Sequence, residues 1–262
     1  MQIPIYQVDA FTDRVFAGNP AAVCPLESWL PDGTLQAIAA ENNLAETAFF
    51  VPAEGGYELR WFTPTVEIDL CGHATLATAC VIMTLLDPGR ERVSFQTRRA
   101  GKLTVAREGD RFTLDFPARP PVASEGHPDL VPALGGAAPE ALFEAAGKYL
   151  VVYTDEETVR GIRPDFRRLP GPRGFGVIVT APGREVDFVS RYFAPAHGID
   201  EDPVTGAAHC TLTPYWAGRL GRTVLEARQV SARGGALTCA LDGDRVRMTG
   251  AAVLYLQGTI HV

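Results

Sequence analysis

Two segments of the chain place small residues and polar groups where an apolar helix is expected to begin. Cys71-Gly72-His73 precedes one apolar segment, and Asp202-Pro203-Val204-Thr205-Gly206 precedes another. The first N–H groups of a helix lack intrahelical partners and, with the helix dipole, favour a bound anion. A glycine at that point lets a ligand approach the backbone closely. Both segments are therefore candidate sites for an acidic small molecule, although Asp202 is equally suited to capping the helix.

Glu46 is the candidate proton carrier. It lies just before a strand-like segment, where a glutamate taken alone is usually a solvated surface residue. The corresponding stretch of the second half, 174–177, contains no acidic residue. A single carboxylate beside two anion-binding helix starts suits general acid–base chemistry at a carbon acid.

His73 and Cys71 each leave alternatives open. His73 could donate a hydrogen bond to a ligand, shuttle a proton, or be a helix-start residue that bonds only to the backbone. Cys71 could have a lowered pKa at a helix N-terminus and act as a thiolate, but the second segment has Asp202-Pro203 where a two-thiol racemase needs a partner thiol. The remaining histidines show no metal-ligand spacing, and P-loop, dinucleotide and nucleophile-elbow motifs are absent. The residues alone therefore argue against a metal site.

An internal repeat organises these residues. Arg-Trp-Phe-Thr-Pro at 60–64 resembles Arg-Tyr-Phe-Ala-Pro at 191–195, an offset of 131 in a chain of 262 residues. In both copies an Ile-Asp pair and a glycine, Gly72 or Gly206, lead into an apolar helix. A helix that is apolar on every face must be enclosed, so the repeat predicts two similar domains, each a curled sheet around one helix.

The patterns of apolar, glycine and proline residues predict the remaining elements. Helices are expected at 34–42, 73–86 and 207–220, and Pro214 should kink or shorten the last of them. The stretch 117–139, rich in Pro, Gly and Ala, is interpreted as the linker between domains 1–117 and 118–262, with the last strand able to return to the first domain. Strands are expected at 3–11, 21–24, 47–51, 57–63, 92–97, 102–107, 111–116, 148–153, 176–180, 186–193 and 253–260.

Composition narrows the class of partner. The net charge of −7 and the absence of a basic run argue against nucleic acid. Five cysteines, an odd number without CxxC spacing, indicate reduced thiols and a cytoplasmic protein. The chain start does not read as a signal peptide, and no apolar run reaches the roughly 18 residues that a membrane helix needs.

Several motifs, in order and spread over nearly the whole chain, resemble the PhzF-like family, named for an isomerase of phenazine biosynthesis. The motifs are Asp9-Ala10-Phe11, Gly18-Asn19-Pro20, Asn43-Leu44-Ala45-Glu46-Thr47, Arg60-Trp61-Phe62-Thr63-Pro64, Cys71-Gly72-His73-Ala74-Thr75 and Glu201-Asp202-Pro203-Val204-Thr205-Gly206.

The resemblance implies an α+β fold like that of diaminopimelate epimerase. Such a fold has two pseudo-symmetric domains, each a barrel-like, mostly antiparallel sheet around a central apolar helix, with the site in a cleft between them. It also implies a cofactor-independent isomerase or epimerase, a homodimer, and a small anionic metabolite as substrate. The catalytic residues implied are Glu46, which moves a proton between substrate carbons, His73 and Asp202. The implied substrate-binding residues are Asn19, Gly72, Thr205, Gly206, Ala207 and Arg233.

One departure bears on the substrate. The phenazine enzyme's motif usually continues Thr-Gly-Ser-Ala, whereas this chain has Ala207 after Gly206 and so lacks a hydroxyl donor. Fold and mechanism therefore transfer better than substrate identity. Two alternatives stay open: a thiol racemase that uses Cys71, and a non-catalytic metabolite-binding or regulatory protein with the same fold.

Overall fold

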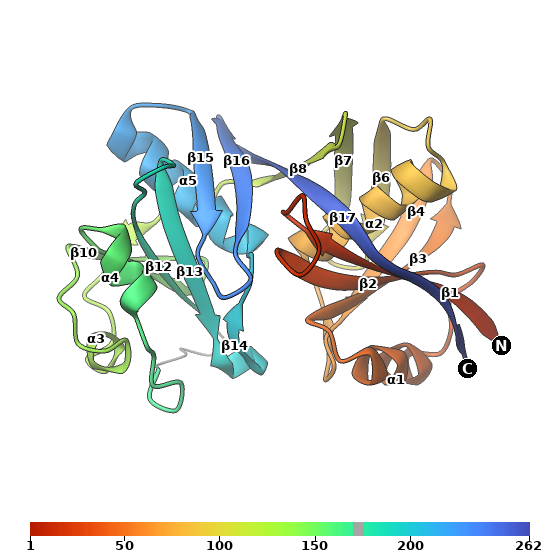
Figure 1. Ribbon diagram of the computed structural model, residues 1–262, viewed down its shortest axis with the longest axis horizontal. Helices are drawn as coiled ribbons and strands as arrows, with labels where there is room; N and C mark the ends of the chain where they lie inside the picture. The colour runs from red at the N-terminus through yellow and green to blue at the C-terminus, as the bar shows by residue number, and fades with distance from the viewer. Residues whose placement is uncertain (170–175) are drawn as a thin grey trace. The chain divides into compact units, whose positions relative to one another are not determined.

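The computed structural model describes residues 1–169 and 176–262 as two compact units. Unit 1 is Met1–Asp115 together with Thr249–Val262, and unit 2 is Phe116–Met248. The chain passes from unit 1 to unit 2 within strand β8 (Arg111–Pro117) and returns within β17 (Arg245–His261), as Figure 1 shows. The final 14 residues thus lie in unit 1, the domain to which the sequence analysis allowed the last strand to return.

Unit 1 is a closed ring of strands. The ring runs β1–β2–β3–β4–β6–β7–β8–β17 and back to β1, with parallel pairs at β2–β3 and β4–β6 and antiparallel pairs at the other junctions for which the register is known. Its elements are β1 (Gln2–Ala10), β2 (Asn19–Pro25), α1 (Asp32–Asn42), β3 (Glu46–Ala53), β4 (Gly56–Phe62), β5 (Glu67–Ile68), α2 (Gly72–Val81), η1 (Ile82–Leu86), β6 (Arg92–Thr97), β7 (Lys102–Glu108), β8 and the end of β17.

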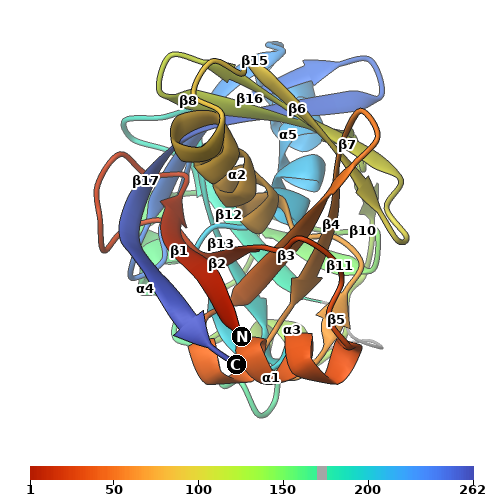
Figure 2. The ribbon, with the colours of Figure 1, turned by 90° about the vertical axis from the view of Figure 1, so that its right-hand side faces the viewer.

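Helix α2 fills the ring, as Figure 2 shows. Every side chain from His73 to Val81 is buried, which the run of apolar and small residues permits. The hydroxyls of Thr75 and Thr78 do not need outside partners, because they donate to the backbone carbonyls of Cys71 and Ala74 one turn earlier. The predicted helix 73–86 is confirmed, with its last turn, η1, wound as a π-helix.

Unit 2 repeats this arrangement. Its pairs run β9–β10–β11–β12–β13–β15–β16, with parallel pairs at β11–β12 and β13–β15. Its elements are β9 (Val122–Ala123), α3 (Leu130–Ala133), β10 (Ala141–Ala145), β11 (Lys148–Val152), α4 (Glu156–Gly161), β12 (Val177–Pro182), β13 (Phe188–Ala194), η2 (Pro195–His197), β14 (Ile199–Asp202), α5 (Gly206–Leu220), β15 (Val224–Gln229), β16 (Gly235–Asp242) and the start of β17.

The internal repeat is visible in matching salt bridges. Arg60 on β4 binds both carboxylate oxygens of Glu67, with Nε–Oε1 and Nη2–Oε2 distances of 2.7 and 2.9 Å. Arg191 on β13 binds Glu201 through the same atoms at the same two distances. Both arginines are almost fully buried. Bidentate pairs of this kind in equivalent hairpins support the prediction of two pseudo-symmetric domains.

The ends of the two halves are exchanged between the units. After β8 the chain forms β9, which pairs with β10 in unit 2, whereas the end of β17 pairs with β1 in unit 1. The interpretation of 117–139 as a linker is therefore wrong. All of this stretch belongs to unit 2, and it carries β9 and α3.

Helix α5 runs through Pro214 without the predicted shortening. A proline leaves the carbonyl four residues earlier without its helical donor. Here that carbonyl, of Cys210, accepts the backbone N–H of Arg119 at 2.8 Å. The lost helical bond is thus replaced from a segment far away in the sequence.

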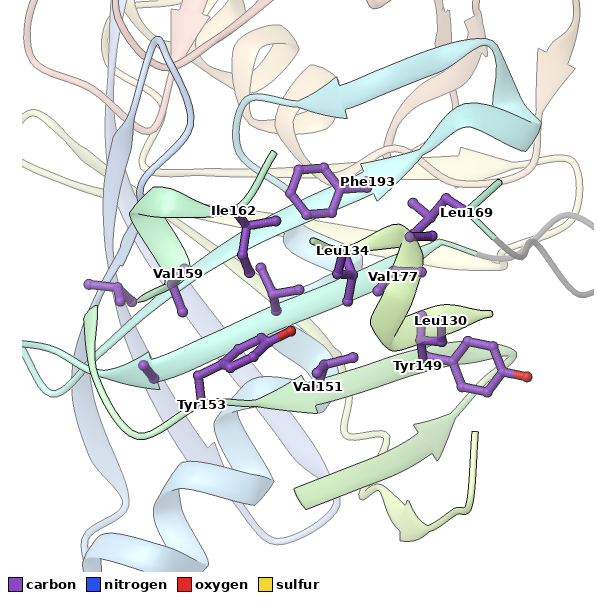
Figure 3. Packing of buried hydrophobic residues seen from close by; sticks show 14 residues of the cluster. Leu130, Leu134, Tyr149, Val151, Tyr153, Val159, Ile162, Leu169, Val177 and Phe193 are labelled. Carbon is purple, nitrogen blue, oxygen red and sulfur yellow. The ribbon is translucent and has the colours of Figure 1, made fainter. Parts of the chain in front are cut away.

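A second apolar layer in unit 2 lies outside the sheet. Helices α3 and α4 pack against β11–β13 through residues such as Val151, Tyr153, Val159 and Phe193, shown in Figure 3. All five cysteines of the chain are buried free thiols. Among the described residues, none of the helices combines the length and the apolar character needed to cross a membrane.

Candidate active site

Three of the predicted site residues come together in unit 1. Asn19 begins β2, and Glu46 begins the parallel neighbouring strand β3, where it pairs with Ala21. His73 lies in the first turn of α2, which packs against both strands. The fold thus brings two strand starts and one helix start to the same place.

The side chains form a buried chain of polar contacts. His73 Nε2 lies 2.9 Å from Glu46 Oε2, at ion-pair distance although not in the angle of a regular hydrogen bond. Asn19 Nδ2 lies 3.0 Å from His73 Nδ1. Asn19 is fully buried and His73 nearly so, whereas the Glu46 side chain keeps 10% of its surface exposed. None of that exposure is at Oε2, so the accessible part of Glu46 faces away from His73.

The environment of His73 favours its charged form. Burial lowers the pKa of the imidazole, but its contacts with Cys71 and Glu46 raise it, and the net pKa lies well above the ordinary value of 6.5. These contacts therefore favour the protonated form of His73. In a neutral imidazole Asn19 Nδ2 donates to Nδ1, and a half-turn of the amide would present its oxygen to the protonated nitrogen.

Cys71 is the residue before α2, and its thiol stays protonated. Its Sγ lies 3.5 Å from His73 Nδ1. Burial and the Glu46 charge raise the pKa of the thiol to about 11, although His73 and the backbone of Ala74 oppose that rise. The lowered pKa considered for Cys71 from its place at a helix start is therefore wrong, because desolvation outweighs the helix end.

Glu46, Cys71 and His73 also offer three ligand atoms within 4.8 Å of one another. Carboxylate, thiolate and imidazole together are a set that zinc accepts. A cation here would have to displace the Glu46–His73 contact and the Cys71 proton.

In unit 2 the structure gathers the remaining predicted residues. Asp202 ends β14, and the N-cap of α5 is Thr205, so the structure does not show the capping position that was one alternative for Asp202. Thr205 Oγ1 instead donates to Asp202 Oδ2. Arg233 lies on the loop between β15 and β16, where Ser231 Oγ donates to the carbonyl of Pro203 at 2.9 Å.

Both central helices begin without a side-chain cap among the described residues. Cys71 and Thr205 occupy the N-cap positions, and neither side chain accepts an N–H of the first turn. Gly72 and Gly206 are the first helical residues, followed by His73 in one unit and by exposed Ala207 in the other. The backbone N–H groups of both starts thus have no capping side chain, as an anion site requires.

Gly176 occupies the position in unit 2 that corresponds to Glu46, as the matched hairpin registers of β3–β4 and β12–β13 show. A Cβ on Gly176 would clash with the Oη of Tyr192, so the tyrosine fills the space that a side chain would need. Residues 174 and 175 of the same predicted stretch lie outside the described residues. Tyr192 belongs to the repeated motif 191–195, but its contact with position 176 depends on strand register and could not be predicted from the sequence.

Comparisons with known proteins agree with this architecture. The family model described as phenazine biosynthesis-like protein matches residues 8–258. An uncharacterized isomerase of Pseudomonas aeruginosa is 54% identical over 262 residues, covering all of both chains. The crystal structure of a PhzF-family protein of Enterococcus faecalis superposes with a TM-score of 0.95 at 47% identity, with 100% of each chain covered.

A more distant structure shares the fold alone. It is a hydroxyproline epimerase of Agrobacterium vitis with bound trans-4-OH-L-proline, with a TM-score of 0.61 at 12% identity over 99% of this chain and 92% of the epimerase. The predicted α+β, epimerase-like fold is confirmed. From its sequence, its fold and these relatives, the chain belongs to the phenazine biosynthesis-like PhzC-PhzF family.

Proposed function

We propose that the protein is a cofactor-independent isomerase that moves a proton between carbons of a small carboxylate-bearing substrate, with Glu46 as the general acid and base. The observation that carries the proposal is the buried Asn19–His73–Glu46 chain in unit 1. It holds a carboxylate at a helix start where an anionic substrate group can bind.

The proposed reaction needs only one proton carrier. The Glu46 carboxylate takes a proton from an acidified C–H bond of the substrate, and the electron pair passes into the adjoining π system. The carboxylic acid then returns the proton to another carbon of the substrate. His73 orients Glu46 and stabilises its anionic form, and Asn19 holds the imidazole. Atoms and electrons balance without an oxidant or a reductant.

Deuterium exchange tests this proposal directly. The protein is incubated in D2O with a panel of small unsaturated and amino carboxylic acids, and the deuterium content of the recovered acids is measured by mass spectrometry. We expect deuterium in at least one acid. Glu46→Gln, which keeps the size but cannot carry a proton, should slow that exchange by on the order of a hundredfold to ten-thousandfold.

Glu41→Gln is the matched control. It is the same substitution on the exposed face of α1, five residues earlier in the chain, and should leave the exchange unchanged. Thermal unfolding of both variants shows that they are folded. Exchange that survives Glu46→Gln would exclude Glu46 as the proton carrier.

The thiol of Cys71 is the second candidate, because it lies 3.5 Å from His73. Its raised pKa of about 11 makes it a poor base at neutral pH. Cys71→Ala should therefore lower the rate of deuterium exchange into the acid by less than about threefold, far below the loss expected for a general acid–base residue. Loss of exchange in Cys71→Ala with retention in Glu46→Gln would support the thiol racemase instead.

The participation of Asp202, Thr205, Gly206 and Arg233 in the same reaction is part of the proposal. Asp202→Asn tests it, since a substrate-contacting carboxylate should affect exchange even though Asp202 and Glu46 belong to different units. Saturable binding of a carboxylic acid without exchange of any acid in the panel would support a non-catalytic binding protein.

A further inference from the structure

Gln229, the last residue of β15, is a buried polar residue that neither the family motifs nor the proposed mechanism uses. It is 1% exposed. Its Oε1 accepts the backbone N–H of Thr205 at 2.9 Å. Its Nε2 donates to the backbone carbonyl of Asp202 at 2.6 Å and to Thr205 Oγ1 at 3.1 Å. One side-chain amide thus holds both ends of the segment 202–205.

These contacts determine the hydrogen-bonding partners of the Thr205 hydroxyl. A threonine at an N-cap normally accepts an N–H from the first helical turn. Thr205 Oγ1 instead accepts from Gln229 and donates to Asp202 Oδ2, and it makes no capping bond to α5 within the described chain. The Gln229 amide therefore orients the Asp202 carboxylate and keeps the Thr205 hydroxyl away from the first N–H groups of α5.

The fold itself does not require a glutamine at this position. Strands β4 and β6 pair Leu59 with Thr97, and the equivalent strands β13 and β15 pair Ser190 with Gln229. Thr97, the counterpart of Gln229, instead donates to Gly101 in its own turn. The same sheet thus forms in unit 1 without an amide that reaches the helix start, so the role of Gln229 is specific to the Asp202 segment.

We propose that Gln229 is a positioning residue, which fixes the Asp202–Thr205 segment so that the Asp202 carboxylate and the uncapped start of α5 are held ready for an acidic substrate. The proposal rests on the proposed function for its substrate. Its structural part, the fixing of the segment, stands on the contacts of Gln229 alone.

The test replaces Gln229 by methionine, which has a similar length but no hydrogen-bonding amide. In Gln229→Met, the Thr205 N–H loses its buried acceptor, and its hydrogen exchange should accelerate about tenfold. Hydrogen–deuterium exchange followed by mass spectrometry of peptides that cover 202–208 measures this. The matched control is Gln96→Met on the exposed face of β6, which should change neither these peptides nor activity.

Activity supplies the second readout. We expect kcat/KM for the deuterium-exchanging acid to fall roughly ten- to a hundredfold in Gln229→Met, the range for a buried group that loses its partner. If Gln229 acts through Asp202, the double variant Asp202→Asn/Gln229→Met should be little worse than Asp202→Asn alone. Gln229→Glu, which keeps the acceptor oxygen and loses the donors, should also lower kcat/KM and serves if the methionine variant does not fold.

The outcomes separate the two proposals. A wild-type protein without exchange activity contradicts the proposed function, whereas the peptide data still decide whether Gln229 fixes the segment. If the backbone amides of peptides covering 202–208 exchange hydrogen at the wild-type rate in a folded Gln229→Met variant, the inference is overturned. The inference is also overturned if the fall in kcat/KM of the double variant equals the product of the falls in the two single variants, because Gln229 would then act independently of Asp202.

Discussion

The buried pair of Glu46 and His73 gives a quantitative prediction for stability. At 2.9 Å, two unit charges attract by about 6 kcal/mol at an effective dielectric constant of about 20. Side-chain exposures of 5% and 10% leave little solvent screening, but dehydrating each ion costs several kcal/mol. We therefore expect a net coupling energy of about 2–5 kcal/mol between the two side chains. His73→Leu should be the more damaging single change, because it leaves the carboxylate buried without its cation.

A double-mutant cycle measures this coupling. Urea unfolding at pH 7 gives the free energies of unfolding for the wild type, Glu46→Gln, His73→Leu and the double variant. The control cycle uses Arg99 and Asp69, which are 2.8 Å apart but 73% and 60% exposed, and should give less than about 1 kcal/mol. A Glu46–His73 coupling no larger than that of the exposed pair would refute the inference that burial makes this contact strong.

Three further predictions concern titration and packing. Because the native pKa of His73 is raised above 6.5, its stabilisation is fully present below pH 6.5 and is lost as pH rises through the native pKa, so the difference in Tm between wild type and His73→Leu should narrow toward alkaline pH. Burial lowers the pKa of His209 from 6.5 to about 4, so the free energy of unfolding should fall by about 3 kcal/mol as pH drops from above 6.5 to 4. In His209→Gln, urea unfolding should show no such contribution to the pH dependence. Gly176→Ala should lower the free energy of unfolding, measured in urea, by about 1–3 kcal/mol because its Cβ would clash with Tyr192 Oη, and the added change Tyr192→Leu should recover part of the loss.

Local patterns predicted the regular elements well where side chains alternate or stay apolar. The strand 92–97 has the predicted bounds, because Val93 and Phe95 point inward between polar residues. Strand β10 (Ala141–Ala145) was missed, since Ala, Leu and Glu favour a helix locally and only pairing with β9 and β11 makes this segment a strand. The effect of Pro214 was mispredicted for a similar reason, because the Arg119 N–H that replaces its helical bond comes from far away in the sequence.

The site was predictable only in part. The motifs identified Glu46, His73 and Asn19, and the structure brings them together because β2 and β3 are parallel neighbours that begin at the same edge. No local pattern could reveal Gln229, because a glutamine at the end of a strand is ordinarily a surface residue. Its role follows from the packing of β15 against the start of α5, which is a property of the tertiary fold.

The pseudo-symmetry of the chain explains why one carboxylate is sufficient for the proposed chemistry. Two equivalent hairpins place Glu46 in unit 1 and Gly176 in unit 2. In unit 2 the ring of Tyr192 occupies the room that a side chain at 176 would need, so a second carboxylate cannot be accommodated there without moving the tyrosine. A two-base racemase needs an acid and a base at once, whereas a proton shift between carbons needs a single group that first accepts and then donates. The asymmetry between Glu46 and Gly176 therefore favours a single shuttling carboxylate over a two-base mechanism that uses these two equivalent positions.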